Sequence, residues 1–137
     1  MNTVTPMDEE FLYEKGVIIF QIDLDRNITF VNREFSNINI YTNDEIISQK
    51  YSLLLHPDMP KAVLSKMWET IKGGQNWNGI VKNIRKDGLY YWSQTEIEPI
   101  KDDNGNVTGY ISVTKPTSIK SIQESTKLYE KMSHTQL

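Results

Sequence analysis

Two neighbouring stretches in the middle of the chain, residues 77–84 and 89–100, present alternating kinds of side chain. A period of two is typical of β-strands, and Asp87-Gly88 between the stretches is a hairpin turn signal. We therefore predict an antiparallel strand pair. One face of the first strand combines a large aromatic residue, a residue without a side chain, a small apolar residue and a carboxamide: Trp77, Gly79, Val81 and Asn83. This mixture indicates the wall of a cavity rather than a dry core.

An amphipathic helix is predicted just before this strand pair. Its apolar residues recur at spacings of three and four and so form one stripe: Val63, Leu64, Met67, Trp68 and Ile71. Pro60 favours a first helical turn, and Asp58 is placed to cap the free backbone N–H groups of that turn. Gly73-Gly74 ends the helix.

The N-terminal part of the chain predicts a second strand pair. Apolar runs at residues 17–22 and 28–31 flank a polar turn at residues 23–27, which is typical of a hairpin. Before this pair, residues 8–14 predict one or two helical turns.

Two short helices are predicted between the N-terminal hairpin and the amphipathic helix. Residues 33–40 follow Asn32, which stands where strand gives way to helix. Thr42 and Glu45 have the spacing of a capping box, so a second helix begins there.

Residues 107–114 predict a last strand, which Pro116 ends. Beyond it, apolar and small residues recur with a helical period: Ile119, Ile122, Thr126, Tyr129 and Met132. This helix has little to bury against within its own length, so we expect it to pair with another helix. The predicted fold class is α+β, with a five-stranded antiparallel sheet, short helices on one face and a C-terminal helix.

The composition fits one soluble globular domain. The chain has 137 residues, of which 38% are hydrophobic and 24% are charged. A net charge of −3 argues against a nucleic acid partner, since phosphate binding needs a concentrated basic face. The chain has no cysteine, which excludes a disulfide scaffold, a thiolate metal site and a cysteinyl adduct, and its two histidines argue against a multi-histidine zinc site.

The sequence shows the pattern of neither a membrane-spanning helix nor a secretion signal. It has no run of about 18 apolar residues. The first basic residue is Lys15, after four acidic residues, which is unlike a signal peptide. We expect a cytoplasmic location.

From about residue 12 to 117 the chain resembles a PAS domain, through the order of its elements and through the segments 25–32, 83–88 and 91–92. More narrowly it resembles the FAD-binding PAS sensors of bacterial aerotaxis and energy-taxis receptors. The motifs that carry this likeness are His56-Pro57-Asp58-Met59-Pro60-Lys61, Met67-Trp68, Trp77-Asn78-Gly79-Ile80-Val81-Lys82-Asn83, Arg85-Lys86 and Tyr91-Trp92. The resemblance divides the chain into an N-terminal cap (1–15), a PAS sensor domain (16–117) and a signalling helix (118–137).

The resemblance implies a sensor that holds FAD non-covalently, reports its redox state to chemotaxis-type signalling and turns over no substrate. It implies that Trp77 and Asn83 contact the isoalloxazine ring. It also marks pocket or pocket-supporting positions at Asn32, His56, Asp58 and Trp68. The partner is a receptor signalling domain or a separate transducer protein.

Two positions depart from the pattern of these sensors. Leu55 stands where the family has arginine, so one expected partner for the anionic part of the cofactor is missing. Ile40 stands where the family has a small glycine and is expected to narrow the pocket. The sequence ends at Leu137, so we expect either a fragment of a receptor or a sensor that signals to a separate protein.

Each candidate residue also has a structural interpretation. Trp77 and Trp68 suit core packing, and Asn32 and Asp58 suit helix capping. An inward carboxamide at Asn83 must be hydrogen-bonded or cost about 1–3 kcal/mol. Three roles stay open for the single histidine of the motif, which are a backbone-bonded residue, a flavin neighbour and an axial heme ligand.

Three rival functions follow from these alternatives. A heme gas sensor would depend on His56, and a flavin enzyme would need an acid/base pair that the sequence does not indicate. An unliganded interaction module would be dimeric through the apolar outer sheet face. For the sensor, a homodimer through that face and the terminal helices also stays open. The apolar residues of that outer face are Ile80, Ile84, Trp92, Ile111 and Val113.

Overall fold

A five-stranded antiparallel sheet organises the protein in the strand order β2-β1-β5-β4-β3. The computed structural model describes residues 3–135. The strands are β1 (Ile18–Asp23), β2 (Ile28–Val31), β3 (Trp77–Ile84), β4 (Tyr90–Lys101) and β5 (Val107–Lys115). The helices are α1 (Arg33–Asn39), α2 (Asn43–Ile46), the 3₁₀ turn η1 (Tyr51–Leu54), α3 (Lys61–Lys72) and α4 (Ile119–Thr135). The predicted α+β fold with a C-terminal helix is confirmed.

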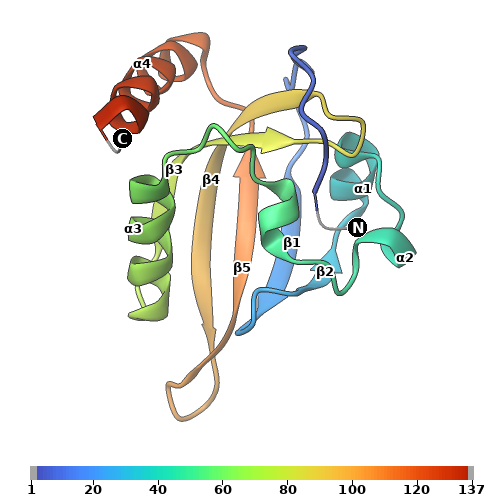
Figure 1. Ribbon diagram of the computed structural model, residues 1–137. Helices are drawn as coiled ribbons and strands as arrows, with labels where there is room; N and C mark the ends of the chain where they lie inside the picture. The colour runs from blue at the N-terminus through green and yellow to red at the C-terminus, as the bar shows by residue number, and fades with distance from the viewer. Residues whose placement is uncertain (1–2, 136–137) are drawn as a thin grey trace.

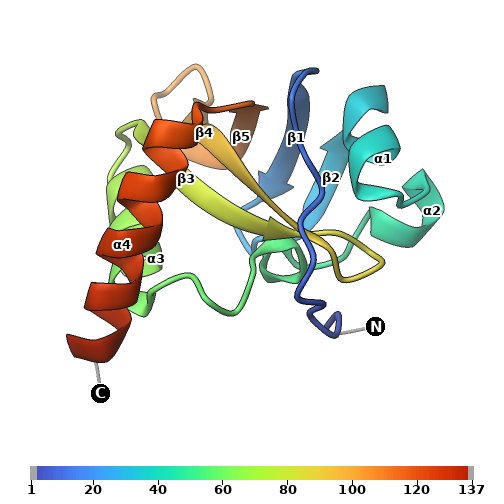
Figure 2. The same ribbon diagram turned by 90° about the horizontal axis from the view of Figure 1, so that it is seen from above.

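The helices gather at the two ends of the sheet. Figure 1 shows α1 and α2 beside β2, and α3 beside β3 at the other end. Figure 2 shows α4 in front of α3 and beside β3, where it contacts Ile80 and Trp92. The sheet therefore has an inner face toward η1 and α3, and an outer face on which α4 packs.

Side-chain caps fix the first two helices as the sequence predicts. The Asn32 side chain accepts a hydrogen bond from the backbone N–H of Phe35, and Thr42 and Glu45 form a complete capping box. Helix α1 ends at Ile40, whose φ of 58° is left-handed. The Ile40 side chain is 40% exposed, so the predicted narrowing of an interior pocket does not follow.

The prediction of helical turns at residues 8–14 is wrong. This segment is extended and pairs with the start of β4, where the Phe11 N–H donates to the Tyr90 carbonyl at 2.8 Å. The Tyr90 N–H in turn donates to the carbonyl of Glu9 at 3.1 Å. Pairing with a distant strand thus overrides a weak local helical pattern.

The predicted cap at Asp58 is also wrong. Helix α3 begins at Lys61 with Pro60 at its N-cap, and no side chain caps it. The Asp58 carboxylate instead accepts a hydrogen bond from Lys82 Nζ at 2.8 Å. An ion pair with β3 therefore holds this carboxylate away from the helix start.

The segment between α2 and α3 runs from one edge strand to the other. Near its beginning, the Ser48 N–H donates to the carbonyl of Ile28 in β2 at 2.7 Å. Near its end, the His56 N–H donates to the carbonyl of Lys82 in β3 at 3.0 Å, and the Lys82 N–H donates to the Met59 sulfur at 3.3 Å. Between these contacts η1 crosses the inner face.

Helix α4 packs on its own domain, which differs from the prediction that it needs another helix to bury against. The Tyr129 hydroxyl donates to the carbonyl of Ile80 at 2.7 Å, and the Tyr129 and Trp92 rings lie 6.2 Å apart. The boundaries at residues 15/16 and 117/118 stay predictions, and residues 1–2 and 136–137 of the two predicted terminal segments lie outside the described part. No helix within residues 3–135 is long and apolar enough to cross a membrane.

Candidate functional site

A row of polar side chains crosses the inner face of the sheet from β3 to β5. The Ser93 hydroxyl donates to Asn83 Oδ1 at 2.7 Å and lies 3.1 Å from the Thr95 hydroxyl. Thr95 in turn lies 3.3 Å from the hydroxyl of Thr114. All four side chains are buried. We call these residues the polar row, and it sets this face apart from the hydrophobic clusters of the protein.

Asn83 has one strong and one weak hydrogen-bond partner within the protein. Its Nδ2 donates to the carbonyl of Leu54 at 3.4 Å, near the limit for a hydrogen bond. The side chain is 8% exposed, so its carboxamide has lost its hydrogen bonds to water. The weak bond to Leu54 compensates for only part of that loss. A ligand with a donor and an acceptor on one edge would complete its hydrogen bonding.

A second observation on the same face is a buried hydroxyl without a partner. Ser112 Oγ has no hydrogen bond within the described residues, and Ser112 lies opposite Ile97 of β4 in the register of β5. The row, with Ser112 beside it, offers both donors and acceptors, as the polar edge of an isoalloxazine ring requires. The residues present therefore fit a flavin.

Trp77 lies at the start of β3 and folds over Gly79. A Cβ added at Gly79 would lie 2.4 Å from the Trp77 ring, so this position requires glycine for the ring to lie there. Trp77 is half-buried and packs against both hydrophobic clusters of the protein. Its indole therefore covers the start of β3 on the face that the strand period predicts to be inward.

Trp68 lies on α3 at an opening beside the sheet. Its ring contacts those of Tyr51 and Tyr110 edge-on, at 5.8 Å and 6.2 Å between centroids. The Arg26 guanidinium lies over it, 3.9 Å from the ring centroid. A cavity of about 550 Å³ opens next to it, between the β1–β2 turn, η1 and α3. Trp68 therefore combines core packing with a place at an entrance.

His56 and Asp58 lie at the outer edge of β3 rather than in the polar row. The His56 ring packs edge-on against Tyr90, which belongs to the outward-facing parity of β4, and His56 Nδ1 accepts the N–H of Asp58 at 3.0 Å. Burial lowers the pKa of His56, the positive charge of Lys82 lowers it further, and Asp58 raises it. The imidazole is therefore neutral at pH 7 and holds a turn through its unprotonated nitrogen.

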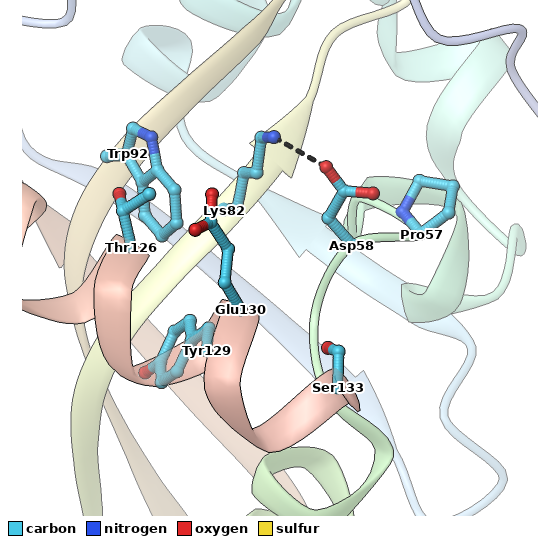
Figure 3. Close-up of a pocket in the computed structure, with 8 residues that line it drawn as sticks. All are labelled: Pro57, Asp58, Lys82, Trp92, Thr126, Tyr129, Glu130 and Ser133. Carbon is cyan, nitrogen blue, oxygen red and sulfur yellow. Dashed lines mark hydrogen bonds and ion pairs between the residues drawn. The ribbon is translucent and has the colours of Figure 1, made fainter. Parts of the chain in front are cut away.

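A second hollow, of about 370 Å³, lies on this outer side between β3 and α4. Figure 3 shows α4 side chains facing Lys82, Asp58 and Trp92 across it. The Lys82 side chain is 14% exposed and ion-paired with Asp58. The pair joins the loop after η1 to β3, and the hollow lies between this loop and the C-terminal helix.

Asn32 has a structural role at the far end of the fold. Its Oδ1 accepts the N–H groups of Phe35 and Ile19 at 2.9 Å and 3.1 Å, and its Nδ2 donates to the carbonyl of Val17 at 2.9 Å. These bonds join α1 to β1. The capping role that the sequence predicts for Asn32 is confirmed.

Trp77 and Asn83 thus lie on the same face of β3 but six positions apart, and Trp68 lies on α3 at the opening. His56 and Asp58 lie at the β3 edge. The sequence analysis did not single out the other polar residues of the inner face, which are Ser93, Thr95, Ser112 and Thr114. Ser93 and Thr95 stand at alternate positions among inward residues of β4, so the strand period alone would have found them. Among the described residues, no group of three or more His, Asp or Glu side chains could hold a metal ion.

Comparison with known proteins identifies relatives among sensors. The aerotaxis receptor of Escherichia coli strain K12 is 37% identical over 122 residues, which is 89% of this chain and 24% of the receptor. The blue-light photoreceptor of Listeria innocua is 37% identical over 93 residues, which is 67% of this chain and 37% of the photoreceptor. The chain therefore spans only part of the length of these relatives.

Solved structures share the fold. A PAS domain from Colwellia psychrerythraea has a TM-score of 0.68 at 21% identity, covering 74% of this chain and 86% of that one. The light-state structure of the blue-light photoreceptor Aureochrome1 LOV has a TM-score of 0.69 at 22% identity, covering 82% of this chain and 92% of that one. A family model described as the PAS fold matches residues 28–114, which is more than half of the sequence. The chain belongs to the PAS family.

Proposed function

We propose that this PAS domain binds FAD non-covalently on the inner face of its sheet and senses redox state. The observation that carries the proposal is the polar row, with the long 3.4 Å contact of Asn83 and the orphan hydroxyl of Ser112 beside it. The similarity to an aerotaxis receptor supports a flavin, and so does the similarity to a light-oxygen-voltage domain studied with a flavin analogue. Within these 137 residues no cysteine is present to form a covalent adduct.

Trp77 and Asn83 contact the ring in this proposal, and Trp68 stands at the entrance. Asn32, His56 and Asp58 support the pocket indirectly, through the hydrogen bonds and the ion pair that hold α1 and the β3 edge in place. When bound, the isoalloxazine supplies a redox centre that gains protons at ring nitrogens on reduction.

The row can relay a change of polarity across the sheet. A carboxamide presents an acceptor on one side and donors on the other, so rotation of the Asn83 side chain exchanges them. In the hydroxyl pairs Ser93–Thr95 and Thr95–Thr114, either hydroxyl can donate the hydrogen bond to the other. A reversal that begins at Asn83 would therefore reach β5.

The same residue leads to the outer face. Asn83 is paired with Leu55 across the β3 edge, and the neighbouring Lys82 carries the ion pair with Asp58. Helix α4 rests on Ile80 and Trp92 of the same strand pair. A shift of β3 would thus change the contacts that hold α4. The altered position of α4 would in turn bias the conformation of a signalling partner.

In this proposal the domain acts in the cytoplasm and passes its signal to a chemotaxis-type domain, in the same chain or in a separate transducer. A second copy joined through the outer face and the terminal helices would make the output a dimer. The domain signals and does not turn over a substrate.

The test is an absorbance spectrum of freshly purified protein before and after dithionite, with chromatography of the chromophore released by heat. A flavin band that bleaches on reduction, with FAD released, is the expected result. A Soret band that His56→Ala abolishes would replace the proposal with a heme sensor. A protein that stays colourless with added FAD would leave an interaction module, and steady NADH oxidation would indicate an enzyme.

Asn83→Val and Asn78→Val form a matched pair for the site. Both change the same residue type on β3, but Asn78 lies on the other parity and is exposed. We expect Asn83→Val to lose most bound flavin and Asn78→Val to keep it. Equal flavin content in the two variants would remove Asn83 from the site.

The relay has its own readout. Oxidised and reduced protein should differ in amide hydrogen exchange across the sheet and in the described parts of both termini. Identical exchange in the two states would contradict the proposed relay but not the proposed flavin binding.

A further inference from the structure

Three cationic side chains gather at the opening beside Trp68, and we infer that this opening binds the diphosphate of a dinucleotide flavin. Arg26, Lys50 and Lys61 line the cavity of about 550 Å³, together with one acidic residue, Asp25. We call these three cations the cationic mouth. The inference rests on the proposed function, because it assumes a flavin ring on the inner face.

A rigid turn holds Arg26 in place. The carboxylate of Asp23 accepts the N–H groups of Asp25 and Asn27 at 2.9 Å each, and the Arg26 carbonyl accepts the N–H of Tyr51 at 2.9 Å. Within this turn Arg26 has a φ of 69°, a left-handed conformation that arginine rarely adopts. The surrounding bonds maintain that conformation, as is common at ligand-binding positions.

The two lysines reach the mouth from other elements. Lys50 precedes η1, and its Nζ donates to the carbonyl of Asp25 at 2.8 Å, which fixes it beside the turn. Lys61 is the first residue of α3. None of the ion pairs between described residues involves Arg26, Lys50 or Lys61. No ion pair within the described part of the chain therefore neutralises these three charges, and an anion from outside the protein can pair with them.

The remaining lining residues suit a phosphate group attached to an apolar ring system. The hydroxyls of Ser52 and Ser65 lie in the same lining and can donate hydrogen bonds to phosphate oxygens. Leu55 and Leu64 supply an apolar wall, and Leu55 is also the residue paired with Asn83. Leu55 therefore lies between the cavity that the cationic mouth lines and the polar row.

This arrangement matches a ligand with a planar head and an anionic tail. The head would lie along the polar row and the tail would pass Leu55 into the mouth. Arginine and lysine are the usual phosphate ligands in proteins. Because the cations come from three separate elements, they can contact two phosphates at once, which selects FAD over FMN and riboflavin.

The test measures the affinity of flavin-free protein for riboflavin, FMN and FAD by equilibrium dialysis. In the unchanged protein we expect FAD to bind at least tenfold tighter than riboflavin, with an advantage that shrinks as salt is added. Arg26→Gln and Lys50→Gln should each lower the affinity for FAD about tenfold, the loss of one charged hydrogen bond, and leave riboflavin unchanged. Lys66→Gln is the control, since Lys66 is an exposed cation on α3 that does not line the cavity.

The outcomes separate this inference from the proposed function. Equal affinities for all three flavins, unchanged in the variants, would overturn the phosphate site while flavin binding stands. FMN that binds as tightly as FAD would overturn the diphosphate assignment. Failure of every flavin to bind would overturn both proposals. A loss of riboflavin affinity equal to the loss for FAD would show that Arg26 acts only on folding of the turn.

Discussion

The left-handed backbone conformation of Ile40 lowers the stability of the folded protein at a single residue. It ends α1 in a left-handed conformation, although its side chain is β-branched and exposed. Such a conformation costs a residue with a Cβ about 1–2 kcal/mol relative to glycine, part of which glycine returns as chain entropy. Ile40→Gly should therefore raise the free energy of unfolding by up to about 1 kcal/mol, measured by urea denaturation.

Ile47→Gly is the matched control for this substitution. Ile47 ends the next helix, but its φ is −61° and its half-buried side chain packs against the core. The same change there should lower the free energy of unfolding. A loss of stability in Ile40→Gly similar to that in Ile47→Gly would contradict the argument from backbone conformation.

His56 makes stability depend on pH in the neutral range. Its pKa is lowered in the folded protein, mainly by burial and by Lys82, so below about pH 6.5 the unfolded chain binds a proton that the folded chain resists. Stability should therefore fall as the pH drops from 7.5 to 5.5. His56→Asn removes the titration but keeps an acceptor for the Asp58 N–H, so its stability should change less over this interval.

His134→Asn is the control for the pH experiment, because it removes the other histidine of the sequence. Comparison of the two variants assigns the slope to one histidine or the other. The carboxylates with lowered pKa, which include Asp23, Asp58 and Asp87, lose their stabilising effect only near pH 4 and below. An unaltered slope in His56→Asn would rule out this histidine as the source.

At the residue scale, the sequence predicted the side chains whose orientation follows from a strand period or a cap. Asn83 faces inward and Asn32 caps α1, as expected. His56 and Asp58 lie in a loop, where no period indicates a face, and their place at the β3 edge follows from hydrogen bonds to a distant strand. Arg26 escaped notice because a charged residue in a polar turn is ordinary in sequence.

At the element scale, α4 depends on one anchor. Tyr129 is 9% exposed, contacts Trp92 and donates to the carbonyl of Ile80. Tyr129→Ala should weaken the docking of α4 by about 3 kcal/mol, as truncation of buried aromatic residues does. The expected result is faster proteolysis and amide exchange within residues 119–133, with the sheet unchanged.

Leu128→Ala gives the comparison for the helix. Leu128 is the adjacent residue and is 54% exposed, so its truncation should leave proteolysis of α4 nearly unchanged. Equal proteolysis in the Tyr129→Ala variant and the unchanged protein would show that other contacts hold α4.

The elements themselves were predicted where the local signal was strong. The hairpin at residues 77–101 carries alternation and turn residues, and α1 and α2 carry side-chain caps, all within a few positions of each other. The N-terminal segment and α4 were predicted less well, since both are placed by contacts with β3 and β4 far away in sequence. Long-range pairing leaves no local pattern to recognise.

At the scale of the whole molecule, the strand order could not be read from the pattern. The last strand, β5, lies between β1 and β4, so the first and last strands are neighbours. This order brings the Ile18 and Thr114 positions side by side and places the polar row near the middle of the sheet. Fold class follows from the kinds and order of elements, whereas strand order depends on pairings between distant parts of the chain.

Both margins of the sheet are closed where a foreign strand would begin to pair. On β3 the backbone groups of Lys82 are taken by His56 and Met59, and the carbonyl of Ile80 is taken by Tyr129. On β2 the N–H and carbonyl of Ile28 are taken by Gln49 and Ser48. Strand addition, which accepts many sequences because it uses the main chain, is thereby blocked at these positions. At these positions recognition by another protein must then depend on side chains, which makes the choice of partner there a property of sequence and hinders edge-to-edge aggregation.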